Sequence, residues 1–190
     1  VGQGSIAGYD VHDINMNLSL ANHVITLDQF QGKQGVSGVF AAKGTADLEG
    51  PLQVQFSAQG IDAGILGKLA GIDAKVRGSV NLDAQLGGTM AEPAADLSVA
   101  IMNGGAGTAM FDSLTGIFNL RQGIIEVNQF VVKKLLNQQE YKVSAAGKIP
   151  LAALDANADE LDRKDQFDLT LSLDHADLSI LPILSKNVDW

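Results

Sequence analysis

Hydrophobic and polar residues alternate most regularly near the middle of the chain. From Val80 to Leu86 every second residue is apolar, and the same alternation returns from Leu97 to Ile101. Successive side chains of a β-strand point to opposite faces, so each run predicts a strand with one apolar and one hydrated face. Gly87, Gly88 and Pro93 favour a turn between the two runs. We therefore expect an antiparallel pair that carries a continuous apolar face.

The same period of two recurs in the first third of the chain. It predicts a hairpin of residues 14–20 and 25–30 around Asn22 and His23, a second turn over residues 31–35, a weaker strand over 36–42 and a clear strand over 52–59. The 190 residues are therefore expected to be mostly β.

The period changes between Asp62 and Ala70. Apolar residues there have helical spacing, Asp62 can cap the first turn, and Gly71 can end the helix. Gly64 and Gly67 lower helix propensity, so we expect only one or two turns. Such a helix is expected to cover an apolar face.

Two stretches of the chain are repeated later in the same order. Residues 18–30 align without a gap with residues 118–130, and residues 56–69 align with residues 171–184. The second alignment predicts another short helix over 177–184. We interpret the chain as one elongated β fragment of a longer protein, residues 1–190, with repeat units at approximately 10–102 and 110–190.

Composition limits the kinds of partner. The formal net charge is −9, and Lys and Arg form no large cluster, which disfavours nucleic acid as a partner. Hydrophobic residues make up 46% of the chain, aromatic residues only 5%, and there are 21 glycines, a combination that suits a bending sheet. The chain has no cysteine, so it contains neither disulfides nor thiolate sites.

Motifs for catalysis and metal binding are incomplete. Residues 2–7 fit a permissive dinucleotide-binding motif, but no predicted strand precedes them. The three histidines, His12, His23 and His175, are not spaced like the ligands of a metal site. Residues 155–159 resemble the opening of a calcium loop, but Glu160 occupies the position of its essential glycine. We expect a protein that is not an enzyme and that uses no cofactor or metal.

Several short motifs together resemble the TamB group of the AsmA-like superfamily. They are an Asp-x-x-Ile-Leu-x-x-Leu segment at 62–69 and again at 177–184, Gly-Thr-x-x-x-Pro at 88–93, Asp-Leu-Ser-Val at 96–99, and the hairpin phrase at 123–130. The acidic insertion at 155–166 departs from this pattern, and no second Gly-Thr-x-x-x-Pro follows. The resemblance rests on the order and repetition of the motifs.

This resemblance implies a periplasmic protein of a two-membraned bacterium, anchored in the inner membrane in its full-length form. It implies a β-taco, an elongated curled antiparallel sheet with a hydrophobic trough and two short helices. The implied function is a lipid-transport bridge that holds phospholipid acyl chains and supports the outer membrane. An outer-membrane assembly barrel protein of the Omp85 type is the implied protein partner.

Two other functions are consistent with the same pattern. One is a scaffold for the assembly of outer-membrane proteins, which would bind its clients by β-strand addition to a sheet edge. The other is a structural solenoid with a filled interior. Periodicity alone does not distinguish a trough from a closed sandwich core, because both use the same side chains.

The residues predicted to form the lipid groove are the apolar members of the alternating runs. They are Ile14, Met16, Leu18, Leu20, Ile25, Leu27, Val54, Phe56, Val80, Leu82, Leu86, Leu97, Val99, Ile101, Phe118, Leu120, Ile125, Val127, Phe167, Leu169, Leu171 and Leu173. The apolar residues of the two short helices are predicted to cap this groove: Ile65, Leu66, Leu69, Ile180, Leu181 and Leu184.

Overall fold

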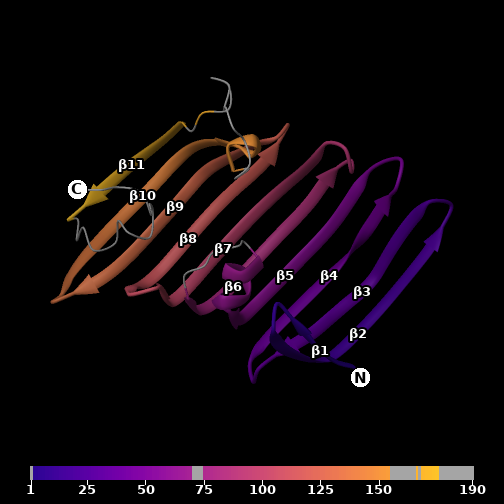
Figure 1. Ribbon diagram of the computed structural model, residues 1–190, viewed down its shortest axis with the longest axis horizontal. Helices are drawn as coiled ribbons and strands as arrows, with labels where there is room; N and C mark the ends of the chain where they lie inside the picture. Colours follow the sequence, from indigo (N-terminus) through magenta and orange to yellow (C-terminus); the bar gives the residue numbers. More distant parts are fainter. Residues whose placement is uncertain (1, 70–74, 155–165, 167, 176–190) are drawn as a thin grey trace.

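The computed structural model describes residues 2–69, 75–154, 166 and 168–175. They form one sheet of 11 strands arranged in chain order, as Figure 1 shows. The strands are β1 (Gly2–Ile6), β2 (Tyr9–Ala21), β3 (Val24–Gln34), β4 (Gly38–Asp47), β5 (Leu52–Asp62), β6 (Val76–Gly88), β7 (Pro93–Ala106), β8 (Ala109–Arg121), β9 (Ile124–Leu136), β10 (Gln139–Pro150) and β11 (Asp168–Asp174).

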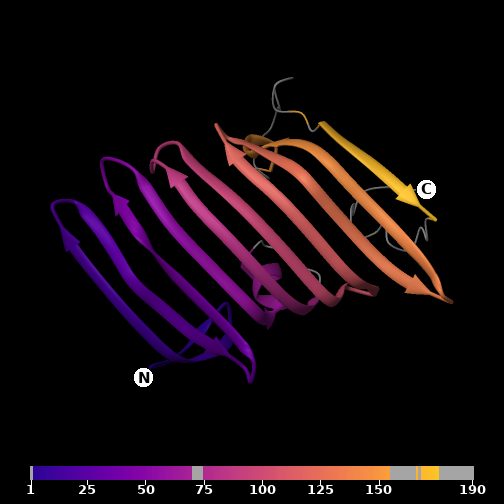
Figure 2. The same cartoon turned by 180° about the vertical axis from the view of Figure 1, so that it is seen from behind.

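Each strand pairs antiparallel with the one before it in the chain. The sheet is curled and does not close, so β1 and β11 lie at its two edges, as both views show (Figures 1 and 2). The predicted elongated, curled antiparallel sheet is therefore confirmed.

The central pair predicted from the alternation is the β6–β7 hairpin. Val80 lies opposite Ile101, and Leu82 lies opposite Val99. The turn between the strands is held by the Thr89 hydroxyl, which accepts a hydrogen bond of 3.0 Å from the backbone N–H of Glu92. The apolar positions of both strands consequently share one face.

The second predicted turn was placed too early. Strand β3 continues to Gln34, and the turn begins at Gly35, where φ is +59°. Gly32 lies within the strand, opposite Phe40 of β4. A side chain at Gly32 would place its Cβ 2.5 Å from the Phe40 ring. Gly32 therefore makes room for a neighbouring ring. The sequence alone does not distinguish a glycine in this role from a glycine that forms a turn.

The two sequence-related hairpins, β2–β3 and β8–β9, share their irregularities. Each turn has two residues with positive φ, Asn22 and His23 in the first and Gln122 and Gly123 in the second, as hairpin turns require. Each hairpin also has a bulge five residues after the second turn residue. Asn17 pairs with Gln29 and Leu18 with Leu27, leaving Asp28 unpaired. Ile117 pairs with Gln129 and Phe118 with Val127, leaving Asn128 unpaired.

A glycine lies beside each of these bulges on the following strand. Gly44 of β4 has φ +152° and Gly147 of β10 has φ +144°, a backbone conformation that other residues rarely adopt. A Cβ at Gly44 would lie 2.1 Å from the Gln53 carbonyl oxygen, and one at Gly147 would lie 2.0 Å from the Asp168 carbonyl oxygen. Both glycines therefore allow the next strand to approach closely. The exact boundaries of the repeat units stay a prediction.

The first predicted helix is α1 (Ala63–Leu69), which packs against β6 and β5. Asp62 caps it, because its carboxylate accepts a 2.7 Å hydrogen bond from the backbone N–H of Gly64. Gly67 allows a close approach, since a Cβ there would lie 2.7 Å from Val76. The second predicted helix lies outside the described residues. A 3₁₀ turn, η1 (Leu151–Leu154), was not predicted.

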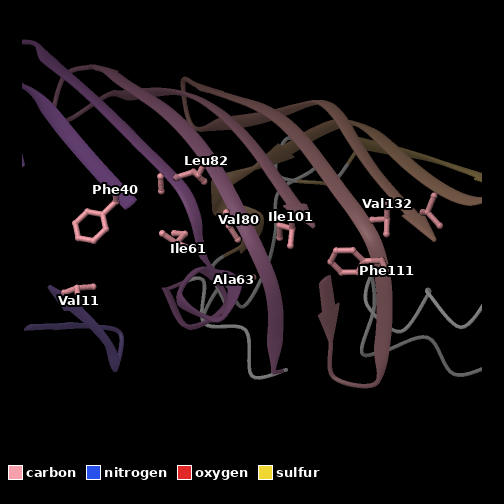
Figure 3. Packing of buried hydrophobic residues seen from close by; sticks show 11 residues of the cluster. Val11, Phe40, Ile61, Ala63, Val80, Leu82, Ile101, Phe111 and Val132 are labelled. Atoms are coloured by element: carbon pink, nitrogen blue, oxygen red, sulfur yellow. The ribbon is translucent and has the colours of Figure 1, made fainter. Parts of the chain in front are cut away.

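Part of the buried core lies between the sheet and α1, and the rest continues along the sheet to Phe111, Val132 and Val143. Figure 3 shows Ile61 and Val80 beside the helix that carries Ala63, with Val11 and Phe40 nearby. The β1–β2 hairpin contributes Val11 because β2 changes its pairing register between His12 and Asn15. The core thus occupies one end of the strands rather than the whole apolar face.

Candidate functional site

The apolar face of the sheet is organised as rows of residues that lie opposite one another on successive strands. We call the row nearest α1 the buried row: Ile61, Val80, Ile101, Leu114, Val132 and Val143. Val80 is 0% exposed, and Val132 and Val143 are nearly as well buried. This row is therefore core and offers no surface to a ligand.

Two rows farther from α1 are partly exposed at every member except the buried Val127, and we call them the open rows. The first contains Met16, Phe30, Ala42, Phe56, Ala84, Leu97, Phe118, Val127, Gly147 and Leu169. The second contains Leu18, Leu27, Gly44, Val54, Leu86, Ala95, Leu120, Ile125 and Ile149. Neither row contains a charged or polar side chain.

Exposure on this face increases with distance from the helix. Along β6, the exposed fraction rises from 9% at Leu82 to 40% at Leu86. At the edge of the sheet, Leu18 is 55% exposed and Leu20 is 67% exposed. Large apolar side chains that follow one another across a sheet in this way form an apolar surface of the kind that marks an interaction site.

An apolar hollow of about 370 Å³ lies over the open rows between β7 and β10. Only apolar atoms are exposed to it. The residues around it are Ala95, Leu97, Phe118, Asn119, Leu120, Ile125 and Ile149. Small-molecule sites are typically concave and lined by apolar and aromatic groups, so this hollow is the most specific candidate on the face.

The structure divides the predicted groove residues into two groups. Val80, Leu82, Ile101 and Val127 are buried, so their side chains offer little surface to a ligand. The first three lie near α1 and the β1–β2 hairpin, which cover this end of the face. The partly or well exposed members are Ile14, Met16, Leu18, Leu20, Ile25, Leu27, Val54, Phe56, Leu86, Leu97, Val99, Phe118, Leu120, Ile125, Leu169, Leu171 and Leu173.

The predicted helix cap is placed only in part. Ile65 is buried in α1 and Leu66 is half-buried against the core, so α1 does lie on the apolar face. The side chain of Leu69 lies outside what is described, as do Phe167, Ile180, Leu181 and Leu184. Contact between the exposed residues and a lipid stays a prediction.

Several residues of the open rows were not predicted. Phe30 and Ile149 have large side chains and add substantially to the apolar surface of the open rows. The small residues that complete the rows are Ala42, Ala84 and Ala95. Phe30 ends its alternating run, and the bulge at Asp28 places it in the same row as Phe56. The alternation of apolar and polar residues does not reveal this bulge. The place of Phe30 in the row could therefore not be predicted from the sequence.

Aromatic rings on this side of the sheet lie close to glycines. A Cβ at Gly116 would lie 2.4 Å from the Phe118 ring, so this ring rests over the glycine. The rings of Phe30 and Phe40 are tilted by 43° with their centroids 5.5 Å apart. Rings that lie along the sheet leave more room above it than upright rings would.

One corner of the apolar face is closed by polar contacts between α1 and the β1–β2 hairpin. The Lys68 ammonium lies 4.9 Å from the centre of the Tyr9 ring and donates a 3.0 Å hydrogen bond to the Ala7 carbonyl. A Cβ at Gly64 would lie 1.9 Å from the Tyr9 hydroxyl oxygen, so this glycine is required for the contact. The hairpin therefore fixes which end of the face is covered.

The opposite face is hydrated and carries the charges. The Asn119 amide donates a 2.5 Å hydrogen bond to the Asp96 carboxylate and the Arg121 guanidinium a 2.7 Å bond, and these hold the pKa of Asp96 below its usual range. A hydrogen bond and charge interaction with Lys33 similarly lower the pKa of Asp13. These pairs are exposed and contribute little to stability.

Hollows of about 430 to 580 Å³ over β2 to β6 are larger than the apolar one. Solvated polar side chains such as Gln31, Lys43 and Gln55 contribute much of their lining. No polar side chain among the described residues is buried, so these hollows lack the desolvated polar groups that give a site specificity. We therefore favour the apolar hollow.

Within the described ranges, no cluster of three or more His, Cys, Asp or Glu side chains could hold a metal ion. None of the helices described has the length and apolar composition needed to cross a membrane. Comparisons with family models, curated proteins and solved structures found no match. The geometry of the apolar face is thus the basis for a functional proposal.

Proposed function

We propose that the open rows hold the hydrocarbon chains of phospholipid. The observation that carries this proposal is the apolar hollow over β7 to β10, which exposes no polar atom. The open rows continue on both sides of it, from β2 to the last strands of the sheet. Across the nine strand spacings from β2 to β11 this surface would extend about 43 Å.

The energetics support binding of chains rather than of headgroups. Removing a methylene from water is worth about 0.8 kcal/mol, so aliphatic walls can hold an acyl chain without polar contacts. The open rows contain neither charged nor hydrogen-bonding side chains. We therefore expect affinity to depend on chain length and only weakly on the headgroup.

In the cell, the proposed role is that of a periplasmic segment of an envelope-spanning lipid-transport bridge. The resemblance of the sequence to the TamB group supports this context. An unclosed sheet supports it as well, because a chain can enter from the side and move along rows that continue from strand to strand. A bridge of this kind needs weak specificity, since its cargo must not be trapped.

The proposal is tested by displacement of an environment-sensitive hydrocarbon dye from the purified protein. Fatty acids of increasing length are expected to displace the dye with increasing affinity, and phosphatidylethanolamine and phosphatidylglycerol with the same chains should compete equally. Strong dependence on the headgroup, or no dye binding by the folded protein, would contradict the proposal. The second result would favour the strand-addition scaffold or the filled solenoid.

A further inference from the structure

The polar face of the sheet is hollowed along strand β4. Three hollows lie there, and they are continuous with one another, because two of them share Gln31 and Ala41 and two share Lys43. Together they follow β4 from Val39 to Thr45, a length of about 20 Å. We call this continuous depression the polar groove.

The polar groove has a low floor and amide-bearing walls. Val39, Ala41 and Thr45 of β4 have short side chains, and the neighbouring strands carry glutamines on the same face. These glutamines are Gln29, Gln31, Gln53, Gln55, Gln59 and Gln85. All six are exposed. Because adjacent strands lie about 4.8 Å apart, amides from successive strands can contact one ligand.

The side chains of this groove are not used in contacts within the protein. None of the six glutamine amides forms a hydrogen bond with another described residue, and Lys43 forms no ion pair with one. Over β7 and β8, in contrast, both Asn119 and Arg121 donate hydrogen bonds to Asp96. The polar groups over β3 to β6 are therefore available to a ligand.

The charge of the polar groove is close to zero. Its lining includes two lysines and three aspartates, a formal net charge of −1, although the whole chain carries −9. Lys33 and Asp13 neutralise each other in an ion pair of 3.0 Å. An anionic polymer needs clustered cations, which this lining lacks. The charge balance therefore favours a neutral, hydrogen-bonding ligand.

We propose that the polar groove binds a linear, uncharged glycan strand. A side-chain amide both donates and accepts hydrogen bonds, and so does a hydroxyl group, so glutamines on both walls match a ligand that carries hydroxyls along its length. The straight course of the groove along one strand suits an extended, β-1,4-linked polymer. A polypeptide is a poorer match, because extended peptides bind sheet edges through their backbone rather than sheet faces.

The affinity of such a site is expected to be low. The glutamines are hydrated in the free protein, so each hydrogen bond to a ligand replaces one to water and contributes little net free energy. We expect a dissociation constant on the order of 1 mM for a short oligosaccharide. This inference does not depend on the proposed function, because the polar groove and the open rows lie on opposite faces of the sheet.

The test is a titration of the isotope-labelled natural chain with cellotetraose, followed by nuclear magnetic resonance of the glutamine side-chain amides. We expect saturable shifts at Gln31, Gln55 and Gln85 and none at Gln129, which lies on β9 outside the groove. Absence of saturable shifts at the groove, or equal shifts at Gln129, would overturn the proposal. Tighter binding of polyphosphate than of cellotetraose in the groove would overturn it as well.

The variant Q55V/Q85V removes two amides from the walls and keeps residues that favour strands. We expect it to raise the dissociation constant for cellotetraose about tenfold or more and to leave hydrocarbon-dye affinity unchanged. The matched control Q129V/Q139V makes the same change at exposed positions outside the groove and should bind cellotetraose like the natural chain. Equal losses in both folded variants would overturn the proposal. If Q55V/Q85V does not fold, the shifts in the natural chain decide the question.

Discussion

Replacing Val80 by aspartate is expected to lower the free energy of unfolding by about 4 kcal/mol, because it places an unpaired charge in the core. Val80 is fully buried between Ile61 and Ile101. No buried polar side chain among the described residues could pair with the new carboxylate. The loss is measured by urea denaturation followed by circular dichroism at neutral pH.

The matched control is Leu86→Asp. Leu86 lies on the same strand and the same face as Val80, but in the open rows, where the new carboxylate stays in contact with water. We expect this variant to lose about 1 kcal/mol or less. Equal, large losses at both positions would mean that the whole apolar face is sealed, as in a sandwich core.

Replacing Phe118 by glutamate is expected to weaken hydrocarbon binding at least about tenfold while the sheet remains folded. The Phe118 side chain borders the apolar hollow, and its loss removes a large contact surface. The new carboxylate would in addition have to be desolvated beneath a bound chain. Titration of the hydrocarbon dye measures the change.

Ile117→Glu provides the control for this prediction. Ile117 precedes Phe118, is 43% exposed and pairs with Ser98 on the polar face. It therefore adds the same charge to the same strand without contacting the hollow. We expect its dye affinity to match that of the natural chain. If both variants lose affinity equally, the dye does not bind at the open rows.

Much of the sheet could be predicted from alternation and turn residues. The β6–β7 hairpin was predicted with the correct apolar face, because Gly87, Gly88 and Pro93 separate two runs of strict period two. Helix α1 was also predicted, since Asp62 and the spacing of Ile65, Leu66 and Leu69 differ from the strands around them. These features are local, and local sequence determines them.

The division of the apolar face into buried and open parts could not be predicted in this way. Leu82 and Leu86 lie on one strand, face the same side and occur in the same alternating pattern, yet only Leu82 is buried. Their difference depends on α1 and on the fold of the β1–β2 hairpin over the sheet. In that arrangement Asp13 has a left-handed backbone and Lys68 contacts the Tyr9 ring, and neither feature has a sequence signature.

The most direct test of the open trough is mass spectrometry of lipids extracted from the protein purified from a two-membraned bacterium without detergent. We predict that phospholipid is recovered with the natural chain and with Ile117→Glu, with mixed headgroups, and that Phe118→Glu yields much less. A folded natural chain that yields no phospholipid, or equal recovery from both variants, would contradict the proposal that the open rows hold acyl chains.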